Sequence, residues 1–177
     1  MAPRIRSAVL ALATVALMAP GPARAQRRPP PPQSAGSGWA PISAGLRIGY
    51  EDKSSSLVFG AGMRIPVIPN GSIQLLPSAD ITFVPKLKEY EYNLEAVYVY
   101  GDRNGGVYAG GGLAWRNTIF DGQSGRQTKQ GHTIVVGLVS SPNGRARLGT
   151  QIELRWIFVD PVLKPRVFSF GVNLPLW

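Results

Sequence analysis

Apolar and polar residues alternate along most of the chain after residue 39. The clearest stretch runs from Arg145 to Asp160, where even positions such as Leu148, Ile152 and Trp156 are apolar and odd positions are mainly polar or glycine. A period of two places alternate side chains on opposite faces of a β-strand. This stretch therefore predicts a strand with one apolar face and one polar face.

The same period recurs in other segments, which are separated by turn residues such as Pro, Asn and Gly. Together the predicted strands cover residues 43–51, 57–65, 72–83, 89–100, 107–116, 133–139, 145–160 and 168–176. Residues 117–131 are polar and form the longest predicted connection. No segment has a helical period. The pattern predicts an all-β fold, an eight-stranded antiparallel up-and-down transmembrane β-barrel.

Aromatic residues indicate what surrounds the apolar face. With the N-terminus on the periplasmic side, most aromatics of that face fall near the outer ends of their strands, and a few fall near the periplasmic ends. Aliphatic residues occupy the level between. Two aromatic girdles around an aliphatic band are typical of outer-membrane barrels. The predicted girdle residues are Tyr50, Phe83, Tyr90, Trp115, Trp156, Phe158 and Trp177.

The opposite face is rich in glycine and in charges of both signs. Glycine weakens a strand that faces water, but in the narrow lumen of a small barrel it leaves room for long side chains. A poorly hydrated interior requires opposite charges to pair. The sequence therefore predicts a plugged lumen, in which the pairing residues are Arg47, Arg64, Asp80, Glu91, Glu95, Arg116, Arg147, Glu153 and Arg155.

The N-terminal residues have a different character. Residues 1–25 combine a basic start, an apolar run and a small-x-small site at Ala23 to Ala25, which predicts a cleaved signal peptide. Residues 26–38 form a Pro-rich linker that cannot pack a core. Residues 39–177 form the predicted β-barrel. This organisation predicts Sec-type export to the bacterial outer membrane.

Composition excludes several functions. Charged residues make up 16% of the chain, fewer than in most soluble domains, and there is no cysteine for a thiolate nucleophile or a metal site. The formal charge is +9, but the cations are scattered along strands and loops. A nucleic-acid partner is not expected, because single-strand binders gather basic and aromatic residues on one face. No cofactor or metal is predicted either.

The C-terminal segment from Val167 to Trp177, with the strand pattern and the signal peptide, resembles the small eight-stranded outer-membrane barrels. The chain is similar to the transmembrane domain of the OmpA and OmpX type over about residues 40 to 177. The resemblance implies that the barrel assembly machinery reads the last strand during insertion. Pro175 and the odd position of Trp177 depart from the family's terminal pattern, so Leu176 is the alternative terminal residue.

The predicted outer rim contains residue types that could serve in catalysis. His132 is the only histidine, and Ser124 and Asp121 lie in the preceding polar segment. A hydrolase needs a nucleophile, a base and an orienting carboxylate, but no spacing here matches a nucleophile motif. The prediction is a non-enzymatic protein with a structural or surface-interaction role, whose partners are outer-membrane lipid and lipopolysaccharide and whose surface partner is unknown. Two alternatives stay open: a soluble periplasmic lipocalin-like ligand-binding barrel, and a rim enzyme acting on outer-membrane lipid.

Overall fold

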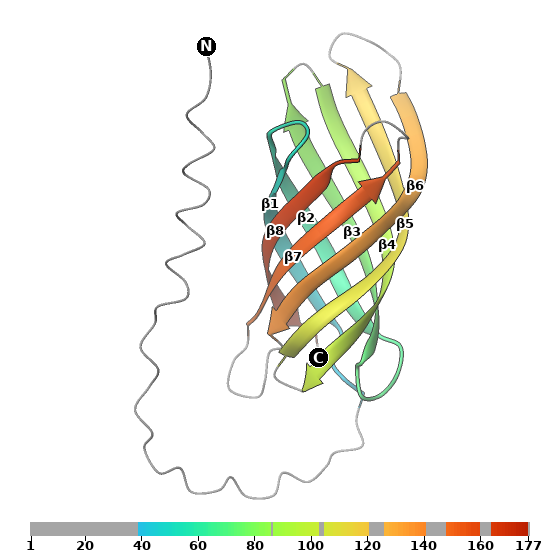
Figure 1. Cartoon of the computed structure of the whole chain (residues 1–177). Coiled ribbons are helices and arrows are strands. Elements are labelled where there is room, and N and C mark those ends of the chain that lie inside the picture. Colours follow the sequence, from blue (N-terminus) through green and yellow to red (C-terminus); the bar gives the residue numbers. More distant parts are fainter. Residues whose placement is uncertain are drawn as a thin grey trace, which may run out of the picture. The chain divides into compact units, whose positions relative to one another are not determined.

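The computed structural model describes residues 39–85, 87–102, 105–120, 126–140, 148–159 and 164–176. In these residues eight antiparallel strands form a closed barrel, each strand bonded to the next (Figure 1). This is the predicted fold class. The strands are β1 (Ser43–Glu51), β2 (Ser56–Pro66), β3 (Ile73–Val84), β4 (Leu87–Asp102), β5 (Gly105–Phe120), β6 (Arg126–Ser140), β7 (Gly149–Phe158) and β8 (Arg166–Pro175).

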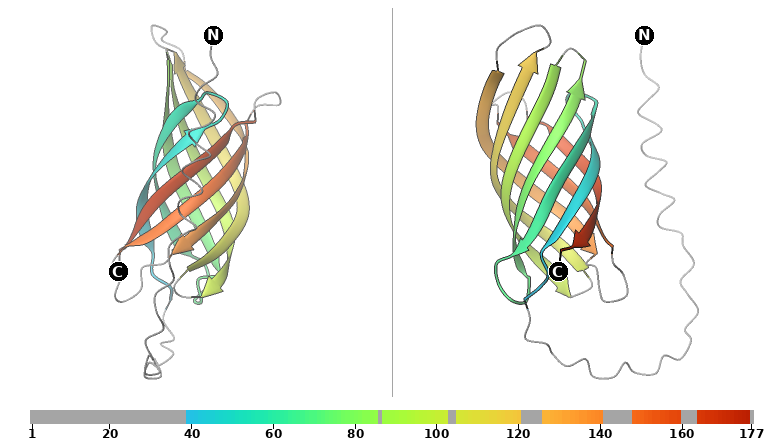
Figure 2. Two further views of the ribbon diagram at one scale, coloured as in Figure 1. Left: turned by 60° about the vertical axis from the view of Figure 1, so that its left-hand side comes forward. Right: turned by 180° about the vertical axis from the view of Figure 1, so that it is seen from behind.

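The first and last strands close the barrel. β1 pairs with β8 along its whole length, from Ser43 opposite Pro175 to Glu51 opposite Val167. The start of β1 and the end of β8 therefore lie at the same end of the barrel, and the strands are tilted against the barrel axis (Figure 2). Closure leaves no sheet edge along these residues, which a strand fold in hydrocarbon requires.

Each strand has the phase that its hydrophobic alternation predicts. In β7, Gln151, Glu153 and Arg155 are buried in the interior, whereas Ile152 on the alternate face is exposed. The interior also holds two apolar clusters, one around Val97 and Tyr108 and the other around Ala114 and Ile157. Charged and apolar side chains thus fill the lumen together.

Strand lengths differ around the barrel. β4, β5 and β6 have 16, 16 and 15 residues, whereas β1, β7 and β8 have 9, 10 and 10. The ladder of β5 with β6 continues to Ile119 opposite Arg126, but the ladder of β6 with β7 ends at His132 opposite Phe158. The longer strands therefore project beyond their neighbours at one end, as the yellow and orange strands show in Figure 1.

The prediction of a connection over residues 117–131 was wrong for most of that range. Residues 117–120 belong to β5 and residues 126–131 belong to β6. Residues 126–131 of β6 extend past the neighbouring strand β7, so neither of their faces covers an apolar surface and both are polar. Polarity on both faces made these residues look like a loop.

The turn between β2 and β3 has the predicted glycine chemistry. Gly71 has a φ of 74°, which glycine adopts without steric cost. The backbone N–H of Gly71 donates to the carbonyl of Ile68 at 2.9 Å, and the Asn70 side-chain oxygen accepts from the N–H of Ser72 at 3.1 Å. This turn sets the register of the β2–β3 hairpin.

Several predictions fall on residues that the structure does not describe. The predicted signal peptide and linker, residues 1–38, lie outside the described residues, and so do Arg147 and Trp177. Within the described ranges, the chain contains no helix of the length and apolarity needed to cross a membrane.

Candidate functional site

The middle of the lumen is organised around Arg155, which is 1% exposed. Its Nε and Nη2 atoms lie 2.8 and 2.9 Å from the two carboxylate oxygens of Glu95. Nη2 also lies 2.8 Å from Glu153 Oε1, and Nη1 lies 3.0 Å from Asp80 Oδ2. One cation from β7 therefore binds carboxylates of β3, β4 and its own strand, which ties opposite walls of the barrel together.

Arg47 of β1 joins the same cluster. Its Nε and Nη2 donate to both oxygens of Asp80, at 2.8 and 2.5 Å, and Nη2 also donates to Ser78 Oγ at 2.8 Å. Gly60 lies beside this pair, and a Cβ there would come within 2.9 Å of Arg47 Nε. Glycine at this position therefore leaves the space that the bidentate ion pair occupies.

Tyr108 of β5 connects the charged cluster to the apolar one. Its hydroxyl donates to Glu153 Oε2 at 2.8 Å, while its ring packs with buried Val135 and Val139. A Cβ on Gly137 would lie 2.5 Å from Tyr108 Cζ. The glycine of β6 therefore makes room for the aromatic ring.

A second charged cluster lies nearer the end from which the long strands project. Arg116 of β5 contacts three carboxylates: Glu51 at 2.6 Å, Glu91 at 3.0 Å and Glu89 at 3.3 Å. Asn93 Nδ2 donates to Glu91 Oε1 at 3.0 Å. These contacts join β1, β4 and β5 across the lumen.

Arg64, towards the opposite end, is bound differently. Its Nε donates to Gln74 Oε1 at 2.9 Å, its Nη1 donates to Gln151 Oε1 at 3.3 Å, and its guanidinium lies 4.5 Å from the centroid of the Tyr108 ring. Arg64 forms no ion pair within the described part of the chain, and its buried Nη2 has no hydrogen-bond partner there. Neutral oxygens and an aromatic face hold this cation.

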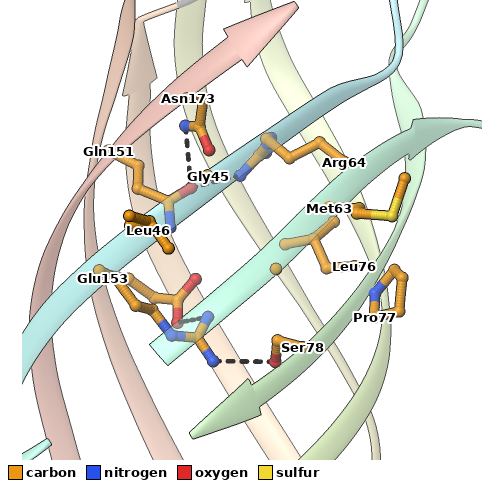
Figure 3. A pocket seen from close by; sticks show the side chains of 12 residues that line it. Gly45, Leu46, Met63, Arg64, Leu76, Pro77, Ser78, Gln151, Glu153 and Asn173 are labelled. Carbon is orange, nitrogen blue, oxygen red and sulfur yellow. Dashed lines mark hydrogen bonds and ion pairs between the residues drawn. The ribbon is translucent and has the colours of Figure 1, made fainter. Parts of the chain in front are cut away.

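A small cavity lies beside Arg64 (Figure 3). Its volume is about 10 Å³, and its lining includes Arg47, Ser78, Glu153 and Asn173. A space of that size accepts about one water molecule. Beside Arg64 the lumen therefore has room for little more than solvent.

The structure places eight of the predicted lumen residues in the interior. It brings together Arg47, Asp80, Glu95, Glu153 and Arg155 in the central cluster, and Glu91 and Arg116 in the second cluster. Arg64 stands apart from both. Glu51 and Glu89, which share the inward phase of their strands, join the second cluster through Arg116. The prediction did not include the neutral side chains with that phase that also take part, namely Gln74, Ser78, Tyr108, Gln151 and Asn173.

The six predicted girdle residues that the structure describes lie on the outward face of their strands. Tyr50 and Phe83 are exposed, and Tyr90, Trp115, Trp156 and Phe158 are half-buried. Phe158 stacks on His132, with ring centroids 4.9 Å apart. The only histidine of the chain therefore packs against an aromatic ring.

The clusters contain no recognisable catalytic arrangement. The arginines contact carboxylate or amide oxygens of the barrel itself. Their hydrogen-bonding groups are therefore largely used within the lumen. Among the residues with described positions, no group of three His, Cys, Asp or Glu side chains is arranged to hold a metal ion. These contacts crosslink strands on different sides of the barrel wall.

Comparison with solved structures identifies barrels of the same type. The N-terminal β-barrel domain of Pseudomonas aeruginosa OprF matches with a TM-score of 0.58 and 17% identity, over 77% of this chain and 98% of that domain. Neisserial surface protein A matches with a TM-score of 0.57 and 15% identity, over 76% of this chain and 96% of that chain. No family model and no curated protein matches the sequence. The chain therefore has the fold of the small eight-stranded outer-membrane β-barrels.

Proposed function

We propose that this chain is a non-enzymatic integral outer-membrane protein, exported by a Sec-type route, whose plugged lumen holds the barrel shut and whose projecting strands face the cell exterior. One observation carries the proposal: the barrel buries its charges and exposes its large apolar side chains. Glu95, Glu153 and Arg155 are at most 1% exposed, whereas Leu46 is 68% and Leu174 52% exposed.

This arrangement is the reverse of a soluble ligand-binding barrel. Soluble monomers rarely expose contiguous apolar patches beyond a few hundred Å², and a lipocalin-like barrel needs an apolar interior. Here the apolar faces of neighbouring strands adjoin around the wall. Hydrocarbon is the solvent that favours this exposure, and it also requires the complete backbone pairing of a closed sheet.

Strand length supports the same setting. A transmembrane β-strand needs about 9 to 11 residues, which β1, β7 and β8 match. β4, β5 and β6 are longer, and the extension of β6 consists of the exposed polar residues 126–130. We expect this polar extension to stand in water beyond the membrane, available to a surface partner.

Lipopolysaccharide is the proposed lipid partner at this rim. Lys88, Arg126, Lys164 and Arg166 are exposed and lie near the strand ends at the projecting side of the barrel. Lysine and arginine bind phosphate groups through charge-assisted hydrogen bonds. The barrel assembly machinery is the proposed partner during insertion, acting on the strand β8.

The test is extraction of membranes from cells that express the full chain. We expect the mature protein to stay in the outer-membrane fraction after urea or carbonate washing, and to migrate faster on gels before heating than after heating. Release of the protein into the wash without detergent would overturn the proposal.

The absence of enzymatic activity has its own test. His132 is the residue around which a rim enzyme would have to be built, yet it stacks on Phe158. We expect His132→Ala to leave the lipid A composition of the host unchanged, as measured by mass spectrometry. A lipid A species that disappears in this variant would establish an enzyme.

A further inference from the structure

The outer face of the barrel has a hollow of about 730 Å³ that crosses β8, β1, β2, β3 and β4. Its lining includes Ala44, Ala61 and Ala79, and the larger side chains Leu46, Met63 and Tyr92. Ligand sites in proteins typically measure about 300 to 1,000 Å³ and are mostly apolar. The hollow is wide and open, its volume lies within this range and its lining is mostly apolar.

The hollow arises because one row of outward residues lacks large side chains. The register aligns Leu46, Ala61, Ala79 and Tyr92 across β1 to β4. The next row towards the projecting end contains Ile48, Phe59, Ile81 and Tyr90. On β2 and β3 this row has alanines where the next row has Phe59 and Ile81. The gap in this row is therefore two strands wide.

The barrel wall beneath the hollow is loosely built. The β2–β3 ladder lacks two successive pairs, Met63 with Pro77 and Arg64 with Leu76, although the register is the same on both sides of the gap. Proline has no N–H to donate to the ladder. On the inner side, Gly45, Gly62 and Ser78 line the small luminal cavity next to Arg64 (Figure 3). If the hollow were empty, the backbone around Gly45, Gly62 and Ser78 would lack dispersion contacts on its outer side as well as beside the luminal cavity.

The chemistry of the lining selects the occupant. No charged side chain contributes to the hollow, and the hollow is continuous with the apolar outer face of the barrel. A two-fold contact with a second copy requires a self-complementary patch. Two copies of a concave surface would leave a space between them. An unbranched hydrocarbon chain, in contrast, is apolar like the lining and can lie over Ala61 and Ala79, between Leu46 and Tyr92.

We propose that this hollow binds one acyl chain of a phospholipid, and this inference rests on the membrane setting proposed above. The hollow reaches Ala44 and Leu174, which lie next to the start of β1 and the end of β8. That end of the barrel faces the periplasm in the proposed orientation. The bound acyl chain therefore comes from the periplasmic leaflet, which supplies phospholipid and not lipopolysaccharide.

The test compares variants that fill the hollow with variants that enlarge alanines elsewhere on the outer face. The double variant Ala61→Leu/Ala79→Leu fills the hollow with two larger side chains. Ala96→Leu/Ala109→Leu is the matched control, because both alanines are exposed on β4 and β5 and neither lines the hollow. The full-length proteins are reconstituted in vesicles of phosphatidylethanolamine and phosphatidylglycerol, extracted in mild detergent and weighed by native mass spectrometry.

We expect one phospholipid per barrel to remain on the wild type and on the control, and at least a tenfold lower occupancy on the filled variant. Equal loss in both variants, or no retained phospholipid on the wild type, would overturn the inference. Retention of lipid A alone when it is added to the vesicles, or a dimer that the filled variant abolishes, would overturn it as well.

Two further measurements separate the possible failures. Heat-dependent gel migration shows whether each variant is folded. Membrane extraction of the wild type tests the proposed function independently: a protein that resists extraction but retains no phospholipid contradicts only the acyl-chain site.

Discussion

The two faces of β7 are held in place by different forces. Its outward residues, such as Ile152 and Leu154, are apolar and contact whatever surrounds the barrel. Its inward residues Glu153 and Arg155 have defined partners on β1, β3, β4 and β5. The outer face therefore requires only an apolar side chain of suitable size, whereas the inner face requires particular residues at particular positions.

The largest expected effect is on the inner face. Arg155→Leu removes the only cation that Glu95 contacts within 4 Å in the described ranges, and leaves Glu153 and Asp80 with fewer partners. Breaking a buried ion pair from one side costs about 3 to 5 kcal/mol. Urea unfolding of the protein in vesicles measures this loss. Leu154→Val is the outward control on the same strand, and an equal cost for both variants would contradict the difference between the faces.

A charge on the outer face is the next test. Val136 lies midway along the β6–β7 ladder and faces outward. Arginine on the lipid face at the bilayer midplane costs about 2 to 4 kcal/mol, and near the interface it costs about 0 to 1 kcal/mol. We expect Val136→Arg to lower the free energy of unfolding in vesicles by the larger amount.

Thr150→Arg is the depth control, because Thr150 is exposed on β7 near the end of the same ladder. It should cost little. If both arginine variants were as stable as the wild type, the outer face would lie in water.

Glycine in the lumen gives an intermediate effect. Gly137→Ala places a Cβ 2.5 Å from both Tyr108 Cζ and the backbone carbonyl oxygen of Ile152, so the ring and the neighbouring strand must move. Overpacking of this kind costs about 1 to 3 kcal/mol. The unfolding free energy measures the cost, and repeating the substitution in a Tyr108→Ala background removes the obstructing ring. The contact with the Ile152 carbonyl oxygen persists in that background, so the cost should fall without vanishing. An unchanged cost would mean that the ring contributes nothing to it.

The smallest expected effect concerns one hydrogen bond. Tyr108→Phe removes the hydroxyl that donates to Glu153 Oε2 but keeps the ring beneath Arg64. Hydrogen bonds to charged groups contribute about 1.5 to 3 kcal/mol, and other bonds contribute about 1 kcal/mol. Since Glu153 keeps Arg155 and Arg47 as partners, we expect a loss of about 1 kcal/mol. A loss as large as that of Arg155→Leu would mean that the hydroxyl organises the whole cluster.

Sequence alternation predicted the outer face better than the inner one. The phase of every strand follows from its apolar positions, because a shift by one residue would expose the whole set on the wrong side. The partners of Arg155 depend instead on the stagger of β3, β4 and β7 around the barrel. Alternation within single strands contains no information about that stagger.

The polar extension of β5 and β6 was missed for a related reason. Residues 126–131 pair with β5 but have no ladder with β7. Water contacts both faces of this ribbon, so no apolar alternation is needed. A strand segment that buries no apolar side chain has the composition of a loop. Only its backbone pairing with a neighbouring strand identifies it as a strand.

The pairing of β1 with β8 has a consequence for biosynthesis. β1 leaves one edge unpaired until β8 has been made, since β8 is its second partner. In the proposed membrane setting each unpaired backbone group costs several kcal/mol, so a chain that lacks β8 has no stable inserted state. Products truncated before β8 therefore lack the contact that completes the barrel, so the β1–β8 pairing separates complete barrels from incomplete ones.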